Sequence, residues 1–311
     1  MIARRIRFGV LRGGALGDFL VTLPALTAIR AHWPDAFVEC VGYPHIAQLA
    51  QAAGLLDQVT SLDQAQMARF FSTQPTFTAQ QVDWVRSFDL IFTYLHDRNG
   101  VVRENLELAG ARQVIYGSPL IPSGIHAADH LVEPLESLAI YVSQAEPHLP
   151  IPVTALPARR GADRPDLAAE KYWIVHPGSG SPAKNWPPDH YFALAQRLES
   201  TGQGTVLFLF GEADCAVRDA LSRLAPDRVL EGLSLLEVVA WLKQARGFIG
   251  NDSGITHLAA ALGTRTWALF GPTDPHQWGP RGKQVRIVSA PERNLQALLP
   301  STVYTAIRDT I

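Results

Sequence analysis

The stretch GFIGNDSGITHLAAA at residues 247–261 joins an apolar strand to an apolar helix through a short polar turn. A strand that ends at glycine and leads directly into a helix is typical of α/β proteins. The N–H groups of the first helical turn have no partner within the helix, and the helix dipole places about half a positive charge there. We therefore expect an anion such as phosphate to bind at this turn. Capping of the helix by Asp252 or Ser253 is the alternative, and both can hold, because a side chain can cap while the backbone binds phosphate.

Strand-like and helix-like segments alternate on both sides of this stretch, which predicts parallel sheets with crossover helices. We expect strands at residues 6–11, 37–41, 89–94, 113–116, 172–176, 205–210, 247–250 and 266–270. We expect helices at residues 19–32 (bent at Pro24), 99–109, 188–201, 213–224, 234–243 and 253–262, with a closing helix within 295–311.

A proline-rich segment between Pro147 and Pro165 interrupts this alternation and is the best candidate for a linker. We expect one α/β domain at residues 1–155 and a second at 156–311, with the closing helix able to pack back on the first. Two similar domains joined by a linker imply a cleft between them, where ligands of such pairs usually bind.

The composition is that of an ordinary globular protein. Hydrophobic residues make up 47% of the 311 and charged residues 18%, and no apolar run approaches the roughly 20 residues that a membrane span needs. The apolar N-terminal stretch breaks at Arg12, too early for a signal peptide. Cys40 and Cys215 lie far apart and form no disulfide framework. We expect a cytoplasmic protein.

Charge is distributed unevenly along the chain. Residues 1–155 hold 10 arginines, no lysine and 14 acidic residues, a net charge of −4, whereas the remainder carries +2. Neither half has a long basic run, which argues against a nucleic-acid-binding protein. The second half is better suited to an anionic ligand.

Two further glycine loops follow strand-like segments. The first, RGGALGD at residues 12–18, matches neither the dinucleotide-binding pattern nor a P-loop. It offers a carboxylate, Asp18, whose alternative role is to cap the helix that follows. The second, HPGSGSPAKNWP at residues 176–187, has small residues that let backbone N–H groups approach an anion, and Lys184 supplies a positive charge. Trp186 followed by prolines argues that this loop is anchored.

Two other strand ends carry weaker signals. GEAD at residues 211–214 offers carboxylates that can accept hydrogen bonds from a ribose, and FGPTDP at residues 270–275 is a stiff turn that can line a sugar pocket. Each is more often plain turn chemistry. His126 and His130 are four residues apart, but there is no obvious third ligand nearby. We therefore predict no metal site.

Together these motifs resemble glycosyltransferase family 9, the heptosyltransferases that use ADP-heptose. The resemblance covers nearly the whole chain, and its motifs occur in the right order. They are RGGALGD at 12–18 followed by TLPAL at 22–26, HPG at 176–178 with Lys184 and Trp186, NDSG at 251–254 with HLAAA at 257–261, and FGPT at 270–273. In one departure, Gly14 stands where many members have serine, so any contact from that hydroxyl is missing.

The resemblance implies a GT-B fold, in which two Rossmann-like domains face each other across a cleft, an inverting mechanism and no required metal. It implies that Asp18 is the catalytic base. It assigns the donor diphosphate to Lys184, Asp252, Ser253 and Gly254, to which we add Ser179. It places an acidic residue near Glu212 on the nucleoside, with Asp214 as the alternative because the register after Gly211 is ambiguous. We assign the sugar pocket to Gly17, Thr273, Asp274 and His257.

We therefore expect a monomeric, metal-independent enzyme that moves a sugar from an ADP-sugar donor to a glycan, glycolipid or small-molecule acceptor. The role typical of the family is lipopolysaccharide core synthesis at the cytoplasmic face of the inner membrane, with at most peripheral membrane contact. One alternative is another GT-B enzyme, such as a hexosyltransferase or an epimerase. The other is an inactive nucleotide-sugar-binding protein, which an intact Asp18 disfavours.

The acceptor is a separate question. The charge of −4 on the first half disfavours an acceptor rich in phosphates and carboxylates, because unlike charges hold such ligands. This favours a neutral or amine-bearing acceptor as an alternative to the lipopolysaccharide core. Four arginines of the first half could still form a local basic cluster, namely Arg69, Arg98, Arg103 and Arg112.

Overall fold

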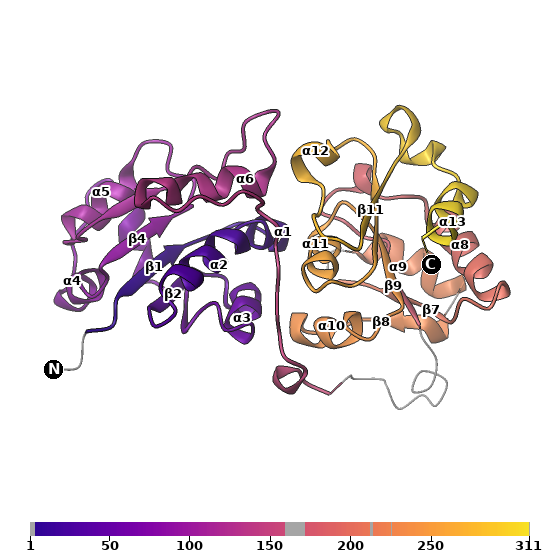
Figure 1. Cartoon of the computed structure of the whole chain (residues 1–311), viewed down its shortest axis with the longest axis horizontal. Coiled ribbons are helices and arrows are strands. Elements are labelled where there is room, and N and C mark those ends of the chain that lie inside the picture. The colour runs from indigo at the N-terminus through magenta and orange to yellow at the C-terminus, as the bar shows by residue number, and fades with distance from the viewer. Residues whose placement is uncertain (1–3, 159–171, 212–213, 225, 311) are drawn as a thin grey trace. The chain divides into compact units, whose positions relative to one another are not determined.

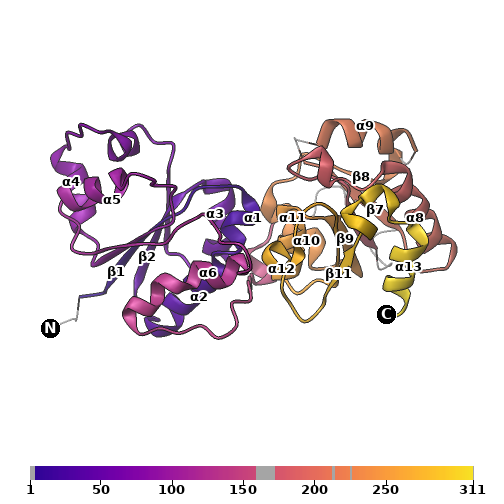
Figure 2. The ribbon, with the colours of Figure 1, turned by 90° about the horizontal axis from the view of Figure 1, so that it is seen from above.

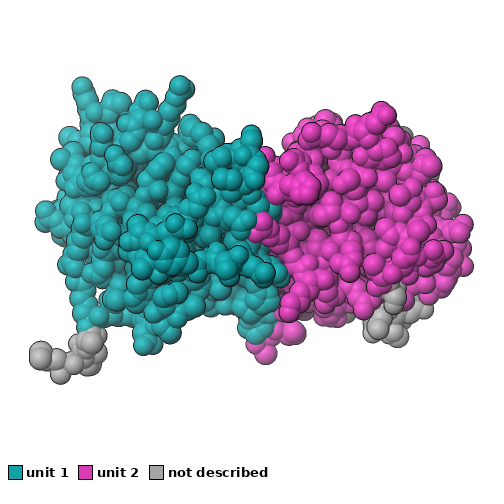
Figure 3. Space-filling view, turned by 45° about the horizontal axis from the view of Figure 1, so that its top comes forward, with its two compact units in different colours: residues 1–152 teal, residues 153–311 magenta. Residues whose placement is uncertain are grey.

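The computed structural model describes residues 4–158, 172–211, 214–224 and 226–310. The chain divides into two compact units, Met1–Pro152 and Val153–Ile311, so the boundary falls within the proline-rich segment. Figure 3 draws the two units in different colours. Each unit has its own parallel sheet covered by helices, as the alternation of apolar segments predicts (Figure 1).

Unit 1 is built on a five-stranded parallel sheet in the order β3-β2-β1-β4-β5. Its strands are β1 (Arg7–Leu11), β2 (Phe37–Gly42), β3 (Gln58–Ser61), β4 (Leu90–Thr93) and β5 (Val114–Tyr116). Its helices are α1 (Leu16–Leu20), α2 (Leu23–His32), α3 (Pro44–Ala52), α4 (Ala79–Arg86), α5 (Val101–Leu108) and α6 (Ala127–Val132), with 3₁₀ turns η1 (Met67–Phe71) and η2 (Glu133–Leu138). Figure 2 shows α4 and α5 on one side of β1 and β2, and α2 and α6 on the other.

The single helix predicted at residues 19–32 is wrong. The chain forms α1 and α2, which are separated at Val21 and Thr22. Pro24 lies in the first turn of α2, where a missing N–H costs nothing because that N–H has no partner within the helix. Pro24 therefore begins a helix and does not bend one.

Unit 2 is built on a six-stranded parallel sheet in the order β11-β10-β9-β6-β7-β8. Its strands are β6 (Trp173–His176), β7 (Val206–Leu209), β8 (Val229–Leu230), β9 (Gly247–Asn251), β10 (Thr266–Phe270) and β11 (Val285–Ser289). Its α-helices are α8 (Pro188–Ser200), α9 (Cys215–Leu224), α10 (Leu235–Leu242), α11 (Gly254–Ala261), α12 (Pro275–Trp278) and α13 (Pro300–Arg308). The 3₁₀ turns of this unit are η3 (Val153–Ala155), η4 (Pro182–Lys184), η6 (Pro226–Arg228), η7 (Pro291–Arg293) and η8 (Leu295–Ala297).

The closing helix α13 belongs to the core of unit 2. It packs against α8, and Val303 and Ile307 are fully buried in the same apolar cluster as Leu198 of α8 and Trp267 of β10. The two helices lie side by side in both ribbon views (Figures 1 and 2).

No helix within the described ranges is long and apolar enough to span a bilayer.

Both sheets have the strand order of a Rossmann fold, and each has one switch point. The order reverses between β1 and β4 in unit 1, and between β6 and β9 in unit 2. Ligands of such sheets bind beyond the carboxyl ends of the strands at the switch point. The loops that matter are therefore those after β1 and β4, and those after β6 and β9.

Candidate functional site

The turn between β9 and α11 in unit 2 is the place where the sequence most clearly predicts an anion site. Helix α11 begins at Gly254, and Ser253 is its N-cap, whose Oγ accepts a hydrogen bond from Thr256 N–H at 3.4 Å. The N–H groups of the first turn point beyond the start of the helix. Ser253 thus fills the capping role, while Asp252 is left for another partner.

That partner is Lys184, which comes from the loop after β6. Its Nζ lies 2.7 Å from Asp252 Oδ2; the lysine side chain is 32% exposed and the aspartate 9%. The two residues are far apart in sequence, and they meet because β6 and β9 are neighbours at the switch point. Four residues predicted to bind the diphosphate lie together here, namely Lys184, Asp252, Ser253 and Gly254.

Asn251 fastens the β6 loop to the end of β9, a role that the motif alone did not reveal. The residue is fully buried. Its Nδ2 donates to Pro177 O at 2.8 Å, and its Oδ1 accepts from Trp186 N–H at 3.0 Å and from the Tyr191 hydroxyl at 2.8 Å. Every polar atom of this buried amide is therefore satisfied by a chain segment that the site needs in place.

Trp186 anchors the far end of the same loop, as predicted. Its ring is fully buried, packs edge-on against Tyr191 with centroids 4.7 Å apart, and donates from Nε1 to Leu298 O at 2.8 Å. Ser179 lies inside the loop, where its hydroxyl donates to Asn185 Oδ1 (2.6 Å) or Ser181 O (2.7 Å). A direct contact of Ser179 with the diphosphate stays a prediction.

The carboxylate of Asp214 is engaged inside unit 2. Its Oδ2 accepts from Gly211 N–H at 2.7 Å and lies 3.8 Å from His176 Nδ1. A Cβ on Gly178 would collide with this carboxylate, so glycine is required there. Burial lowers the pKa of His176, while the Asp214 charge opposes that shift. Neutral His176 then donates from Nδ1 to Leu209 O at 3.0 Å.

Asp214 therefore joins the loops after β6 and β7, and a ribose contact by this residue stays a prediction. Glu212, the other predicted nucleoside ligand, lies outside the described residues.

The residues predicted for the sugar pocket lie in three places. Asp274 is the N-cap of α12 and accepts from His276 N–H at 2.9 Å. Next to it, Thr273 Oγ1 is buried and has no hydrogen-bond partner among the described residues. His257 is buried in α11, and Gly17 lies in α1 of unit 1. The pocket itself stays a prediction.

In unit 1, Asp18 is the third residue of α1 and lies at the edge where β1 ends. Its Oδ2 accepts from Ala15 N–H at 2.9 Å, so the predicted contribution to the start of the helix is present. For Oδ1, no hydrogen bond is found within the described chain. The carboxylate thus combines a fixed oxygen with one that is available as a proton acceptor.

The backbone at residue 14 favours glycine over the serine that many members of the resembled family have at this position. Its φ is +90°, in the left-handed region that favours glycine. A Cβ at this position would lie 2.8 Å from Asp18 Oδ2. In this conformation of the loop, any side chain at residue 14 would displace the carboxylate of Asp18.

The histidines considered as metal ligands have other roles. His126 Nδ1 accepts from Ala128 N–H at 3.1 Å and caps α6. His130 lies 3.1 Å from Ser118 O through Nε2 and 3.0 Å from Glu133 Oε2 through Nδ1. The described residues contain no group of three or more side chains able to hold a metal ion.

Comparison with known proteins shows the family to which the chain is related. The family model described as glycosyltransferase family 9 (heptosyltransferase) matches residues 127–303, more than half of the chain. Lipooligosaccharide heptosyltransferase 2 of Haemophilus influenzae is 34% identical over 122 residues, which cover 37% of this chain and 35% of that protein. Lipopolysaccharide heptosyltransferase 1 of Pseudomonas aeruginosa is 36% identical over 131 residues, covering 40% and 36%. These matches span about a third of the length of the curated relatives.

Solved structures share the fold over the whole chain. The Escherichia coli heptosyltransferase WaaC with ADP has a TM-score of 0.74 at 22% identity, covering 98% of this chain and all of that one. A family 9 glycosyltransferase from Veillonella parvula has a TM-score of 0.78 at 18% identity, covering 100% and 98%. At these identities the likeness shows the fold, which is the predicted GT-B fold of two Rossmann-like domains.

Proposed function

The chain belongs to glycosyltransferase family 9, and we propose that it transfers a heptose from an ADP-sugar to an acceptor hydroxyl in lipopolysaccharide core synthesis, with inversion at the sugar. The observation that carries this proposal is the ion pair of Lys184 with Asp252 beside the N-terminus of α11 at a sheet switch point. A lysine and a helix N-terminus at this position suit a nucleotide diphosphate.

In the proposed mechanism Asp18 is the general base. Its Oδ1 takes the proton of the acceptor hydroxyl while that oxygen forms a bond to the anomeric carbon. The bond from this carbon to the diphosphate oxygen breaks on the opposite face, and the nucleotide leaves with the bonding electron pair. One displacement inverts the centre, by the geometry known for inverting glycosidases.

The lysine and the backbone N–H groups of the candidate site in unit 2 act on the leaving diphosphate. Its negative charge grows as the glycosidic bond breaks, so Lys184 and the first-turn N–H groups of α11 stabilise the transition state more than the bound donor. They are held in place before the reaction by Asn251 and Trp186. Such preorganisation makes Lys184 and these N–H groups more effective, because they need no reorganisation during the reaction.

The proposed function is tested by ligand-induced stabilisation and by transfer. ADP, UDP and GDP sugars are added separately, and the melting temperature is measured, since a ligand that binds only the folded state stabilises it by mass action. We expect ADP-heptose to give the largest shift and a radiolabelled donor to pass label to an acceptor. A shift without transfer or hydrolysis would indicate a binding protein, and a larger shift with UDP or GDP sugars would indicate another donor.

We expect donor binding and turnover to survive EDTA. Lys184 and the N-terminus of α11 supply positive charge to the diphosphate, so no divalent cation is needed to neutralise it. The Kd for ADP and the transfer rate are measured while the EDTA concentration is raised in steps of about 5-fold. Both are measured again after magnesium is added back. Strict dependence of either quantity on added magnesium would refute this assignment.

A second candidate acceptor is favoured by the charge of unit 1. Three of the four arginines considered as a basic cluster are already engaged within the unit. Arg69 donates to Thr76, Arg103 lies 3.9 Å from Glu107, and Arg112 pairs with Asp89 at 2.7 Å. We propose as the alternative that the acceptor is neutral or amine-bearing rather than a phosphorylated core.

A salt series distinguishes the two acceptors. If the alternative holds, transfer to a lipid A acceptor bearing Kdo should be weak and nearly independent of salt between low ionic strength and about 0.5 M, where screening acts within a few ångströms. Efficient transfer at low salt that falls steeply as salt rises would instead show electrostatic binding of an anionic acceptor. The measured quantity is kcat/KM for the acceptor at each salt concentration.

A further inference from the structure

Arg12, the first residue after β1, is buried at the edge of unit 1 where Asp18 lies. The residue is 5% exposed. Its backbone N–H donates to Val41 O at 2.9 Å, which extends the contact between β1 and β2. A Cβ on Gly42 would lie 2.6 Å from Arg12 O, so glycine is needed for this close approach. The backbone of Arg12 is thus held firmly by the sheet.

The guanidinium of Arg12 binds backbone carbonyls. Nη2 and Nε donate to Asp18 O at 2.6 and 3.2 Å, and Nη1 donates to Tyr94 O at 3.3 Å. Burial lowers the pKa of Arg12, while the charge of Asp18 is the main opposing influence. Within the described chain this arginine has no ion pair, whereas six other arginines of unit 1 do, namely Arg4, Arg5, Arg7, Arg30, Arg103 and Arg112.

The carbonyl of Asp18 needs such a partner because α1 is very short. A helix of five residues has little stability of its own. At its end Thr22 N–H donates to Phe19 O at 3.0 Å, one residue beyond Asp18. The Asp18 carbonyl accepts instead from Arg12 and from the Thr22 hydroxyl at 2.9 Å. Two side chains therefore fix the backbone of Asp18.

We propose that Arg12 is a positioning residue that directs the Asp18 carboxylate by fixing its backbone against the end of β4. This inference rests on the proposed role of Asp18 as the base. The hydrogen bonds of the guanidinium go to the Asp18 carbonyl, so Oδ1 stays open to the acceptor hydroxyl. Arg12 also joins the two loops at the switch point of unit 1, because Asp18 follows β1 and Tyr94 follows β4.

The first test is Arg12→Lys, which keeps the charge but cannot reach both carbonyls with a planar fork. We expect kcat to fall by about 10-fold or more, since small misplacements of a reacting group are costly, while the donor KM changes by less than about twofold. Thr22→Val removes the second donor to Asp18 O without changing charge, and we expect a smaller fall in kcat.

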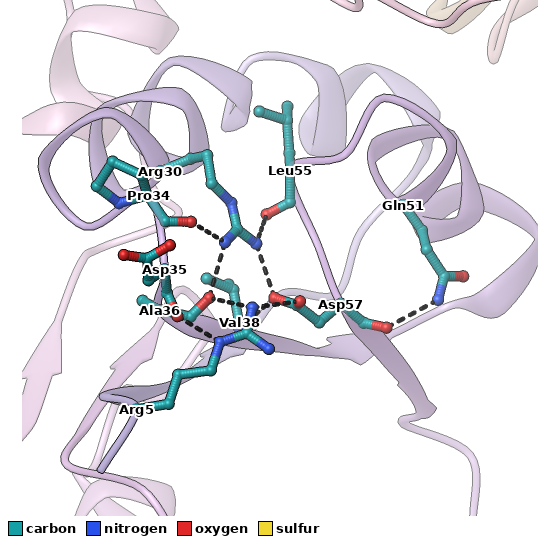
Figure 4. A network of polar contacts seen from close by, with 9 residues as sticks. All are labelled: Arg5, Arg30, Pro34, Asp35, Ala36, Val38, Gln51, Leu55 and Asp57. Atoms are coloured by element: carbon teal, nitrogen blue, oxygen red, sulfur yellow. Dashed lines mark hydrogen bonds and ion pairs between the residues drawn. The ribbon is translucent and has the colours of Figure 1, made fainter. Parts of the chain in front are cut away.

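Arg30 provides the matched control. It donates to the carbonyls of Pro34, Ala36 and Leu55 and pairs with Asp57 at 2.7 Å, in the network shown in Figure 4. These residues lie at the amino ends of β2 and β3, away from Asp18. Arg30→Lys should lower the melting temperature about as much as Arg12→Lys and leave kcat unchanged. Equal kcat values for the two variants would overturn the proposal.

Two further measurements separate positioning from general stability. In an Asp18→Asn background, Arg12→Lys should cause no additional loss of kcat, because the base that it positions is gone; a fully additive loss would contradict the proposal. Amide hydrogen exchange in residues 15–22 should become faster in Arg12→Lys and not in Arg30→Lys. Unchanged exchange in Arg12→Lys would show that Arg12 does not fix the backbone of α1. A lack of transfer by the wild type, or full kcat in Asp18→Asn, would instead refute the proposed function, and the exchange result would still decide whether Arg12 holds α1.

Discussion

Asp18→Asn should lower kcat by about 10²- to 10⁴-fold, the usual contribution of a general base, and leave the Kd for ADP within about twofold of the wild type. The amide has nearly the same size as the carboxylate but cannot accept the proton of the acceptor hydroxyl. Its oxygen can still accept from Ala15 N–H, the bond that Asp18 Oδ2 makes at 2.9 Å. The start of α1 should therefore survive the substitution. Single-turnover transfer and ADP titration measure the two quantities.

The matched control for this variant is Glu237→Gln. Glu237 is likewise the third residue of a helix, and its Oε2 accepts from the N-cap residue, Ser234 N–H, at 2.8 Å. Both substitutions remove one negative charge from the first turn of a helix, which costs typically about 0.3–1 kcal/mol. We expect similar changes in melting temperature and a normal kcat for Glu237→Gln. Near-normal turnover in Asp18→Asn would reduce Asp18 to a helix cap.

The central strands and the turns beside the site could be predicted because their signals are local. The segment at residues 247–250 is apolar, the NDSG turn follows at once, and the observed α11 begins within that turn at Gly254. Three edge strands were missed. β8 (Val229–Leu230) has only two residues, too few to form a pattern in the sequence. The other two were missed for a different physical reason. β3 and β11 are exposed or partly exposed along most of their length, so β3 reads Gln-Val-Thr-Ser and β11 contains Arg286. Such strands lack the continuous apolar run of a buried parallel strand.

The fastening of the site could not be predicted, because it depends on residues far apart in sequence. Asn251 belongs to the NDSG motif, but its bonds to Pro177 and Trp186 follow from the pairing of β9 with β6. In the same way, the motifs place both Lys184 and Asp252 near the diphosphate, but only the structure shows that the two side chains pair. Local patterns therefore indicated which residues to consider for the site, and the strand order determined which of these residues meet.

That ion pair leads to the second large effect. Lys184→Ala should raise the Kd for ADP by about 100-fold, which corresponds to about 2.7 kcal/mol and lies near the upper end of the roughly 1.5–3 kcal/mol that one charged hydrogen bond contributes. We expect a loss near the upper end because the 9%-exposed carboxylate of Asp252 would stay beside the diphosphate without its cation. Like charges in a partly buried site repel strongly because water screens them poorly.

This explanation makes the double variant informative. Lys184→Ala combined with Asp252→Asn should bind ADP more tightly than Lys184→Ala alone, with a Kd about 10-fold above the wild type, since the unpaired carboxylate is removed as well. Lys283→Ala is the control, because Lys283 is an exposed lysine of the same unit. It precedes the edge strand β11, whereas Lys184 and Asp252 follow the carboxyl ends of the central strands β6 and β9. Its Kd should stay within about twofold of the wild type, a shift expected from a distant surface charge. An unchanged Kd in Lys184→Ala would remove Lys184 from the donor site. A double variant that binds no better than Lys184→Ala would show that Asp252 contributes to donor binding by itself and not only through the lysine.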